Sequence, residues 1–537
     1  MTDNYSEVQR LASESEVQRL TSDSEVRGYN EDFARREGRR RTARIITFGC
    51  KMNDNDSEKI MGLLVSMGYE IESAPTSGKF GNPAPLGLAG GIRLPDVVIL
   101  NTCCVRENAE RRFFGILGSL KRYKAEDPSR VLAVCGCMMQ EANAVDKILK
   151  KYGYVDFIFG TKAISELPAL LCGAYRRKAE QSIRECAGAK DGAGAGAGAG
   201  AGTAAGTGAG ASARAGEVAV SNALDGKAPE DALPMHRKAP PHALISVMSG
   251  CDNFCSYCIV PYVRGREQSR TPASVIREAA GLAGLGYSEI TLLGQNVNSY
   301  GKELPDGERC DFAELLRKIS RIEGIRRIRF MTSHPKDLSD RLICAIRDLD
   351  AVCPHLHLPV QSGSTAVLKL MNRGYSREDY LKLIGKIKEA IPDITLTTDV
   401  IVGFPGEGDR DFDDTLQLAD EVGFDMAYTF LFSPRAGTAA AGFSDQVPEA
   451  AAKERFDRLV KLQNDISYKK NLALVGKTVE VLCEGVSKTN GDRLTGRTPG
   501  GKVVNFTAAV DGAVGTYMDV RIEKARTWSL DGAILAT

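Results

Sequence analysis

The sequence has no long hydrophobic run, no excess of one charge and too few cysteines for a disulfide scaffold. No apolar stretch reaches the length of a membrane-spanning helix, and the polar N-terminus lacks the apolar core of a secretory signal. Lys and Arg total 70 against 69 Asp and Glu, so any nucleic-acid surface has to be local. The 14 cysteines are sparse and grouped, which favours metal binding in a reducing compartment. We therefore expect a cytoplasmic protein without membrane attachment.

The composition changes along the chain and predicts several domains. Residues 1–43 contain a nine-residue repeat beginning at Ser6, Ser15 and Ser24, followed by an arginine-rich run, and we expect a disordered or transiently helical tail. Residues 44–172 alternate short apolar strands with helix-like stretches, which predicts a small parallel α/β domain. Residues 173–232 are rich in Gly and Ala and predict a flexible linker.

The second half of the chain repeats a strand and helix pattern and then changes to short strands. Residues 233–474 contain six strand–helix units, which predicts a central partial (β/α)6 barrel with its chemistry at the C-terminal ends of the strands. Residues 475–537 consist of short β segments between Gly-containing turns and predict a small antiparallel β-barrel. The fold class is therefore an α/β multidomain protein.

Three cysteines, Cys251, Cys255 and Cys258, follow the first strand of the predicted barrel in a C-x3-C-x2-C pattern. Three thiolates from one loop are the ligands of a [4Fe–4S] cluster whose fourth iron stays open to a ligand. A zinc loop usually has a partner pair that completes four protein ligands, and no such pair lies nearby. A zinc loop or a group of buried structural cysteines remains the alternative.

Residues near the ends of the predicted barrel strands are suited to hold a small molecule. The Tyr257 ring is placed to pack against a ligand of the open iron, and the later segments offer glycines for close approach and amide or carboxylate groups. The candidate ligand-binding residues are Tyr257, Gly294, Gln295, Asn296, Gln361, Ser362, Asp399, Gly403 and Glu407.

A second set of cysteines, Cys50, Cys103 and Cys137, follows three predicted strands of the first domain. The ends of parallel strands meet at one sheet edge, so these thiols are expected to converge and to hold a second [4Fe–4S] cluster. Independent buried cysteines are the alternative. Two neighbours, Cys104 and Cys135, either compete for iron or pack as small apolar side chains.

The Cys251–Cys258 loop and the later ligand segments resemble the radical S-adenosylmethionine (SAM) superfamily. With Cys50, Cys103, Cys137 and the Arg264-Gly-Arg-Glu267 run, residues 44–172 and 233–537 resemble the methylthiotransferase family. The resemblance implies two [4Fe–4S] clusters and SAM as cofactors. It gives radical formation to Cys251, Cys255 and Cys258, and a sulfur-carrying auxiliary cluster to Cys50, Cys103 and Cys137.

Within that family, the runs after Cys50 and Cys104 and the Arg264–Glu267 run most resemble the members that act on tRNA. The resemblance implies methylthiolation of carbon 2 of N6-isopentenyl-adenosine at position 37, next to the anticodon, with two SAM molecules used per product. A base in a single-stranded loop is easier to splay out than one in a duplex. The implied partners are the tRNA anticodon loop, an electron donor and a sulfur source, and we expect a monomer.

The last domain resembles a TRAM RNA-binding barrel, whose basic residues offer phosphate contacts and whose Phe506, Tyr517 and Trp528 offer stacking faces. For Trp528 the alternative, which we favour, is a place in the barrel core. Two alternatives stay open. A related methylthiotransferase acts on threonylcarbamoyl-adenosine in tRNA or on a ribosomal-protein aspartate. A non-catalytic iron–sulfur RNA-binding protein would not need the ligand segments.

Overall fold

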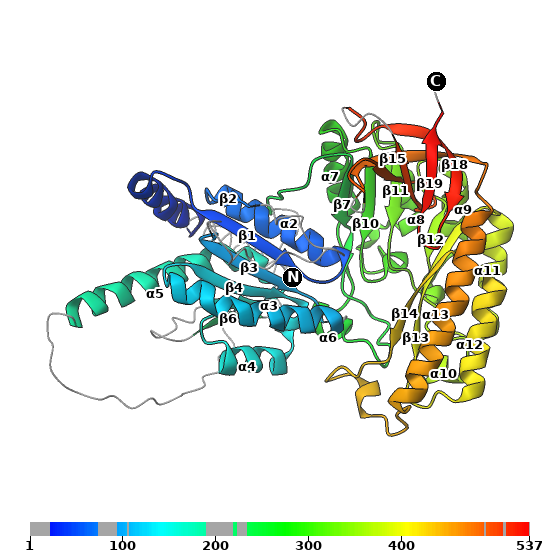
Figure 1. Ribbon diagram of the computed structural model, residues 1–537, viewed down its shortest axis with the longest axis horizontal. Helices are drawn as coiled ribbons and strands as arrows, with labels where there is room; N and C mark the ends of the chain where they lie inside the picture. The colour runs from blue at the N-terminus through cyan, green and yellow to red at the C-terminus, as the bar shows by residue number, and fades with distance from the viewer. Residues whose placement is uncertain are drawn as a thin grey trace. The chain divides into compact units, whose positions relative to one another are not determined.

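The computed structural model describes residues 22–72, 94–104, 107–188, 218–222, 233–487, 490–507 and 512–535 (Figure 1). The chain forms two compact units. Unit 1 comprises Met1–Arg237 with Tyr262–Arg264, and unit 2 comprises Lys238–Pro261 with Gly265–Thr537. The first repeat copy, all but the last two residues of the second copy, and the Gly/Ala run lie outside the described residues. No helix in the described part of the chain is long and apolar enough to cross a membrane.

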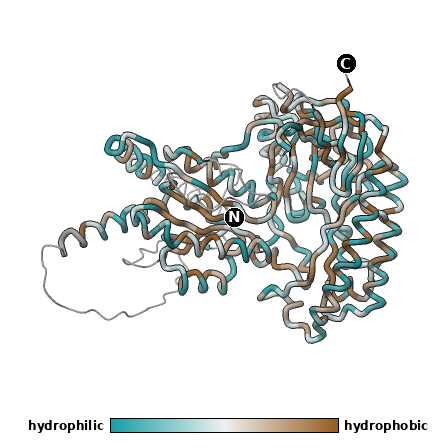
Figure 2. Tube along the Cα trace, viewed as in Figure 1, coloured by the Kyte–Doolittle hydropathy of each residue, from teal (hydrophilic) through white to brown (hydrophobic). Residues whose placement is uncertain are grey.

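Unit 1 is built on a parallel sheet in the order β2-β1-β3-β4-β5-β6. Its strands are β1 (Thr42–Thr47), β2 (Glu70–Ile71), β3 (Val97–Thr102), β4 (Val131–Gly136), β5 (Phe157–Phe159) and β6 (Ala219–Ser221). Its helices are residues 22–37, α2 (Lys51–Ser66), α3 (Glu107–Glu126), α4 (Ala142–Lys151) and α5 (Leu167–Gly188). Every residue of β3 and β4 is buried, as expected for central strands covered on both faces. Figure 2 shows hydrophobic residues along the strands of this sheet.

The structure corrects two boundaries of the predicted first domain. Residues 22–37, expected in a disordered or transiently helical tail, form a helix in which Val26 is fully buried in the core that also contains Ile60 and Leu63 of α2. Helix α5 continues past residue 172, where the linker was expected to begin, and β6 adds an edge strand. Apolar contacts with the sheet therefore order segments whose composition is polar or rich in small residues.

Unit 2 contains the predicted partial barrel as two parallel three-stranded sheets, β11-β10-β7 and β12-β13-β14. A single bridge between Ile328 and Val352 lies at the junction. The strands are β7 (His242–Ser246), β8 (Met248–Ser249), β9 (Gln268–Ser269), β10 (Glu289–Leu293), β11 (Arg327–Phe330), β12 (His355–His357), β13 (Thr395–Val402) and β14 (Met426–Leu431). The helices are α6 (Val260–Arg264), which ends in unit 1, α7 (Pro272–Gly284), α8 (Phe312–Ser320), α9 (Asp340–Asp348), α10 (Thr365–Leu370), α11 (Arg377–Ala390), α12 (Asp409–Val422) and α13 (Glu449–Leu472).

The C-terminal residues of unit 2 close into a barrel in the order β15-β16-β17-β19-β18. Its strands are β15 (Thr478–Val486), β16 (Leu494–Arg497), β17 (Val503–Thr507), β18 (Tyr517–Ala525) and β19 (Leu530–Ile534). The closed barrel was predicted, but the closing pair β17–β19 is parallel rather than antiparallel. Closure removes the exposed sheet edges and leaves a small apolar core.

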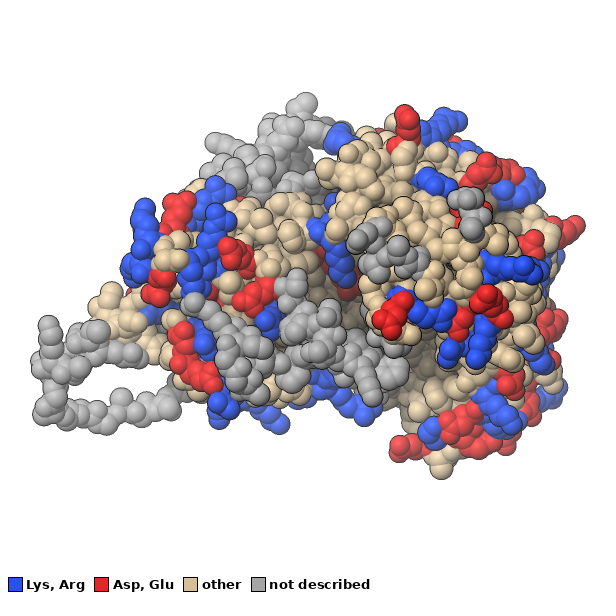
Figure 3. Space-filling model, turned by 45° about the horizontal axis from the view of Figure 1, so that its top comes forward, with Lys and Arg blue, Asp and Glu red and all other residues tan. Residues whose placement is uncertain are grey.

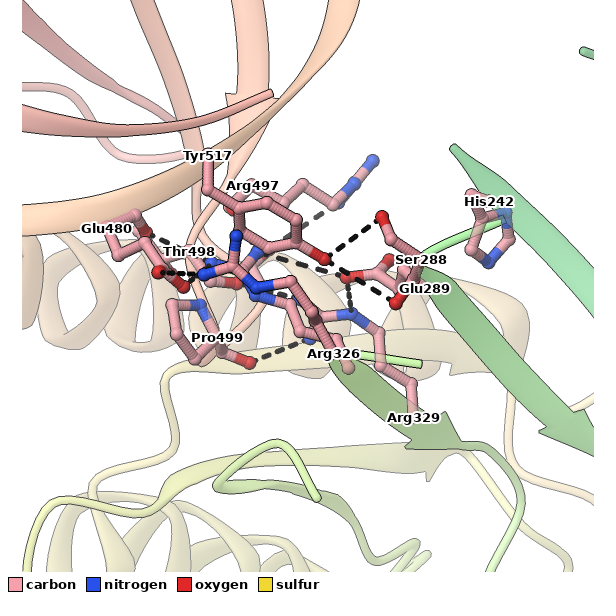
Figure 4. A network of polar contacts seen from close by, with 12 residues as sticks. His242, Ser288, Glu289, Arg326, Arg329, Glu480, Arg497, Thr498, Pro499 and Tyr517 are labelled. Atoms are coloured by element: carbon pink, nitrogen blue, oxygen red, sulfur yellow. Dashed lines mark hydrogen bonds and ion pairs between the residues drawn. The ribbon is translucent and has the colours of Figure 1, made fainter. Parts of the chain in front are cut away.

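A network of buried charges joins this barrel to the first strands of unit 2 (Figure 4). Glu289 of β10 lies 3.0 Å from Arg329 Nε, and Arg327 of the same strand as Arg329 reaches Glu480 of β15 at 2.7 Å. Arg329 also donates to the carbonyls of Pro499 and Thr498 at 2.7 and 2.8 Å. The arginines therefore bind the barrel, while Glu289, whose side chain is 3% exposed, balances their charge.

We predict that Glu289→Gln destabilises unit 2 by about 3 kcal/mol, because it leaves the buried guanidinium group of Arg329 without its carboxylate. Thermal or denaturant unfolding measures the loss. The matched control is Asp348→Asn, which also changes a carboxylate to an amide but removes an exposed pair with Arg347. Equal unfolding curves for the two variants would contradict the role given to Glu289.

Candidate functional site

Three neighbouring strands of unit 1 end at the same level. In the sheet, Asn101 of β3 pairs with Thr47 of β1 and with Cys135 of β4, and Thr102 pairs with Gly136. The chain therefore leaves all three strands at one sheet edge, as predicted. Cys50 lies three residues beyond β1, whereas Cys103 and Cys137 follow β3 and β4 directly.

The thiols of Cys50, Cys103 and Cys137 occupy this edge with that of Cys104. A hydrogen bond with Cys103, assisted by the charge of Arg264, lowers the pKa of Cys50 to about 6. Cys50 also precedes the first residue of α2, and a helix N-terminus favours a thiolate. Cys104 hydrogen-bonds Cys137 and lowers its pKa. The site therefore stabilises thiolates, which are the form of cysteine that binds metal.

The structure separates the two extra cysteines, Cys104 and Cys135. The Cys104 side chain lies beside Cys137 at the sheet edge. Cys135 points to the other side, into the apolar core with Ala133 and Phe157, and burial raises its pKa well above the usual value. Cys135 therefore packs as a small apolar side chain, and only Cys104 lies within reach of the expected ligands.

Two glycines let the backbone approach this edge closely. A Cβ on Gly49, whose φ is +134°, would lie 2.4 Å from Cys103 Cβ. A Cβ on Gly136, whose φ is +103°, would lie 2.2 Å from the Thr102 carbonyl oxygen. Both positions require glycine because the space and the backbone conformation exclude a side chain.

The C-x3-C-x2-C loop of unit 2 is held by its backbone. The Cys251 amide donates to the Gly265 carbonyl at 3.2 Å, and the Cys258 amide donates to the Cys255 carbonyl at 2.9 Å. Burial raises the pKa of Cys251 and raises that of Cys258 to about 12. Binding of a metal to these two thiols is therefore coupled to the loss of their protons.

Some of the residues predicted to bind a small molecule have structural roles instead. Gln295 Oε1 accepts a hydrogen bond from the Gly250 amide at 2.6 Å and so supports the cysteine loop. Glu407 is buried and pairs with Arg455 of α13 at 2.9 Å. Four more fill packing or hydrogen-bonding positions, namely Gly294 against Met248, Gly403 against Ala452, Ser362 with Thr415, and Asn296 with Asp337.

Other residues predicted to bind a small molecule have a polar group or an aromatic ring without such a structural role. The buried Oε1 of Gln361 has no hydrogen-bond partner among the described residues, and Gln361 has a φ of +74°. Asp399 Oδ2 lies 3.6 Å from His357 Nε2, and its side chain is 26% exposed. Tyr257 packs edge-on against Phe404. The unsatisfied group of Gln361 fits a site that a polar ligand completes.

Two buried arginines beside the cysteines were not assigned a role from the sequence. Arg264, which groups with unit 1, donates from Nε to Cys137 Sγ at 3.3 Å. Arg373 of unit 2 donates from Nη1 to Cys255 Sγ at 3.4 Å. Arg264 stood in a motif that carried the family resemblance, whereas nothing local in the sequence marked Arg373.

A single metal ion and a [4Fe–4S] cluster place different demands on their ligands. Within the described residues, no group of three or more His, Cys, Asp or Glu side chains is arranged to hold one metal ion. A [4Fe–4S] cluster makes a different demand, because its protein thiolates bind separate iron atoms. Beside the unit 2 loop, a hollow of ≈ 210 Å³ is lined by Asp252, Asn253, Glu267, Lys302, Glu303, Lys336 and Asp337.

The barrel surface differs from the prediction at its aromatic residues. Phe506 is fully buried, and the Tyr517 ring lies under Arg326 at 3.6 Å, so neither is free to stack on a base. Trp528, expected in the core, is 51% exposed because it lies in the turn before β19. Exposed Lys477, Arg521 and Lys524 have no ion pair among the described residues, in a surface where both charges are interspersed (Figure 3).

Comparison with known proteins gives three matching regions. Residues 245–419 match the Radical SAM superfamily, residues 91–160 match the uncharacterized protein family UPF0004, and residues 472–535 match the TRAM domain. The solved structure of TsrM from Kitasatospora setae, a radical S-adenosylmethionine methyltransferase, aligns with a TM-score of 0.46 and 15% identity over 73% of each chain. Residues 245–419 therefore define a radical SAM domain.

Curated relatives of nearly equal length narrow this class. The chain is 49% identical to the tRNA-2-methylthio-N(6)-dimethylallyladenosine synthase of Acetivibrio thermocellus, over 93% of this chain and 92% of that protein. It is 46% identical to the protein of the same name from Clostridium perfringens, over 91% and 97%. The chain belongs to the family of tRNA-2-methylthio-N(6)-dimethylallyladenosine synthases. Its cofactors are SAM and [4Fe–4S] clusters.

We predict that Gly49→Ala destabilises unit 1 by about 2 kcal/mol, because the new Cβ overlaps Cys103 and the backbone is in a conformation that disfavours L side chains. Thermal unfolding measures the change. The matched control is Gly118→Ala in α3, where a Cβ meets no atom within 4 Å. Helix propensity favours Ala there by about 1 kcal/mol, so that variant should be at least as stable as the parent.

Proposed function

We propose that this chain converts N6-isopentenyl-adenosine at position 37 of tRNA to its 2-methylthio derivative. The observation that carries the proposal is the second group of cysteines at one edge of the unit 1 sheet, in addition to the radical SAM loop of unit 2. Its relatives' shared name supports the same substrate. The alternative of a threonylcarbamoyl-adenosine or protein substrate has no corresponding support, and the alternative of a non-catalytic protein disagrees with the family.

In this proposal Cys251, Cys255 and Cys258 hold the cluster that binds SAM, and Cys50, Cys103 and Cys137 hold the auxiliary cluster. When bound, these cofactors supply a 5′-deoxyadenosyl radical and a sulfur that becomes methylated. The unpartnered Gln361 Oε1, Asp399 and the Tyr257 ring are the groups most available to orient SAM. An electron donor and a sulfur source are required in addition, and the enzyme acts as a cytoplasmic monomer.

The chain's own residues prepare both sites. Gly49 and Gly136 let the strand ends approach closely, which keeps the thiols of unit 1 together. Gln295 fixes the start of the unit 2 loop through the Gly250 amide. Rigid support of this kind keeps the ligands in position without reorganisation when the cofactors bind.

The barrel supplies the RNA contacts in this proposal. Lys477 lies next to Arg521, because Thr478 pairs with Arg521 across β15 and β18. With Lys524 and exposed Trp528, these side chains offer phosphate contacts and one stacking face. The charge network at Glu289 holds this barrel against β10 and β11, whose sheet also contains β7, the strand that precedes the radical SAM loop.

The cluster assignment predicts a contrast between two cysteines of one segment. Cys137→Ala should reduce the iron content from about eight to about four per chain, whereas Cys135→Ala should keep about eight, because its side chain lies in the apolar core. In cells lacking the gene, Cys135→Ala should restore 2-methylthio-N6-isopentenyl-adenosine and Cys137→Ala should leave the isopentenyl nucleoside unmodified. Iron and sulfide analysis and mass spectrometry of digested tRNA measure both results. An unchanged nucleoside in the deletion strain, with no other enzyme supplying it, would falsify the substrate.

The RNA assignment predicts that Arg521→Ala weakens tRNA binding and lowers the slope of log affinity against log salt by about 1, because one phosphate contact is lost. Binding of the full-length enzyme to tRNA over a range of salt concentrations measures this slope. Glu523→Ala on the same strand is the control, since it removes an exposed negative charge and should not weaken binding. Identical slopes for the parent and Arg521→Ala would exclude Arg521 from the RNA surface.

A further inference from the structure

Each cysteine set has one buried arginine that donates a hydrogen bond to one of its thiols. Arg373 Nη1 lies 3.4 Å from Cys255 Sγ, and Arg264 Nε lies 3.3 Å from Cys137 Sγ. Both arginines are 5% exposed. A guanidinium group at a metal thiolate contributes a directed N–H group and a positive charge.

Arg373 has no carboxylate to balance its charge. Its Nη2 donates to the Pro359 carbonyl at 2.7 Å and its Nε to the Tyr375 hydroxyl at 2.9 Å. No ion pair joins Arg373 to an acidic residue in the described part of the chain. A buried charge without a counter-charge is costly, so the thiolates of the unit 2 loop are the negative groups that Arg373 is placed to meet.

Hydrogen bonds hold Arg373 rigidly beside the cysteine loop. The Ser256 amide donates to the Met371 carbonyl at 3.0 Å, and the Ser256 hydroxyl donates to the Leu370 carbonyl at 2.8 Å. Asn372 Nδ2 donates to the Phe254 carbonyl at 3.0 Å. The segment before Arg373 is thus tied to the residues on both sides of Cys255, which fixes the guanidinium at one thiol.

Arg264 differs because its charge is already neutralised. Arg264 Nη2 lies 2.7 Å from Asp56 Oδ2, and each side chain is 6% exposed. The unit 1 site therefore receives a hydrogen bond from a neutral ion pair. The unit 2 site receives a hydrogen bond from an unbalanced positive charge.

We propose that Arg373 is a positioning residue that raises the reduction potential of the cluster held by Cys251, Cys255 and Cys258. In the unit 1 site, Asp56 neutralises the charge of Arg264, so that Arg264 does not raise the potential of the auxiliary cluster in the same way. The inference rests on the cluster assignment under the proposed function. Hydrogen bonds to the sulfurs and net charge near a cluster set its potential. A positive charge favours the reduced cluster because reduction adds a negative charge.

The test for Arg373 uses the full-length chain in which Cys50, Cys103 and Cys137 are changed to Ala, so that one cluster remains. In this background Arg373→Gln should lower the equilibrium constant for one-electron reduction of the cluster at least tenfold. This corresponds to a reduction potential that is lower by about 59 mV. Arg373→Lys, which keeps the charge, and Tyr375→Phe, which removes one hydrogen-bond partner of Arg373, should each change it by less than half of that shift. Redox titration with dithionite, followed by electron paramagnetic resonance without SAM, measures the potential.

The test for Asp56 uses the full-length chain in which Cys251, Cys255 and Cys258 are changed to Ala. Asp56→Asn should raise the potential of the remaining cluster, because Arg264 then acts as an unbalanced charge. Opposite signs for Arg373→Gln and Asp56→Asn support the inference, since a merely structural loss gives no reason for them. An unchanged potential in Arg373→Gln, or an equal shift in Arg373→Lys, overturns it.

The iron content keeps this inference separate from the cluster assignment. About four irons in each triple-alanine parent support the assignment, and the potentials then decide the role of the arginines. If either parent binds no cluster, the proposed function fails first and the inference falls with it. If Arg373→Gln is the one variant that does not take up iron, the potentials of Arg373→Lys and Asp56→Asn decide. A parent-like potential in Arg373→Lys together with a raised potential in Asp56→Asn supports the inference. Any other combination of these two potentials overturns it.

Discussion

The common level at which β1, β3 and β4 end is the constraint on which the unit 1 site depends. Parallel strands need crossover helices, and each crossover returns the chain to the same starting edge of the sheet. Cys50, Cys103 and Cys137 come from distant parts of the sequence, yet the pairing of Asn101 with Thr47 and Cys135 brings their strands into step. A slip of one residue in that register would separate the thiols and also turn Cys135 out of the core.

Buried charges decide a second level of organisation. Glu289 balances arginines of β11 that also bind the carbonyls of the C-terminal barrel, so the barrel and the radical SAM loop lie in one compact unit. A barrel tethered only by a flexible linker would give bound RNA no fixed relation to that loop. The charge network therefore contributes to function through position, although none of its members is a reacting group.

The sequence was sufficient where the chemistry is local or follows the sheet topology. The strand–helix alternation predicted the fold class, and the strand-end positions of Cys50, Cys103 and Cys137 predicted that their strands end at one sheet edge. The spacing of Cys251, Cys255 and Cys258 is local, and the cluster that it indicates stays a prediction. The sequence did not predict roles that depend on residues far apart in the chain. Arg373, for example, contacts Cys255 only because the chain folds. Trp528 was misplaced because its hydrophobicity suggested the core, whereas the turn before β19 leaves it exposed. The helix at 22–37 was missed because tertiary burial of Val26 outweighs a polar composition.

The different surroundings of Arg264 and Arg373 agree with the different tasks assigned to the two sites. A site that has to accept an electron benefits from a nearby positive charge that no carboxylate cancels. A site that has to hold sulfur needs stable thiolates, which the hydrogen bonds around Cys50 and Cys137 already favour, without a net charge from the Arg264–Asp56 pair. One type of side chain thus serves both sites, and a single aspartate next to it makes the difference between them.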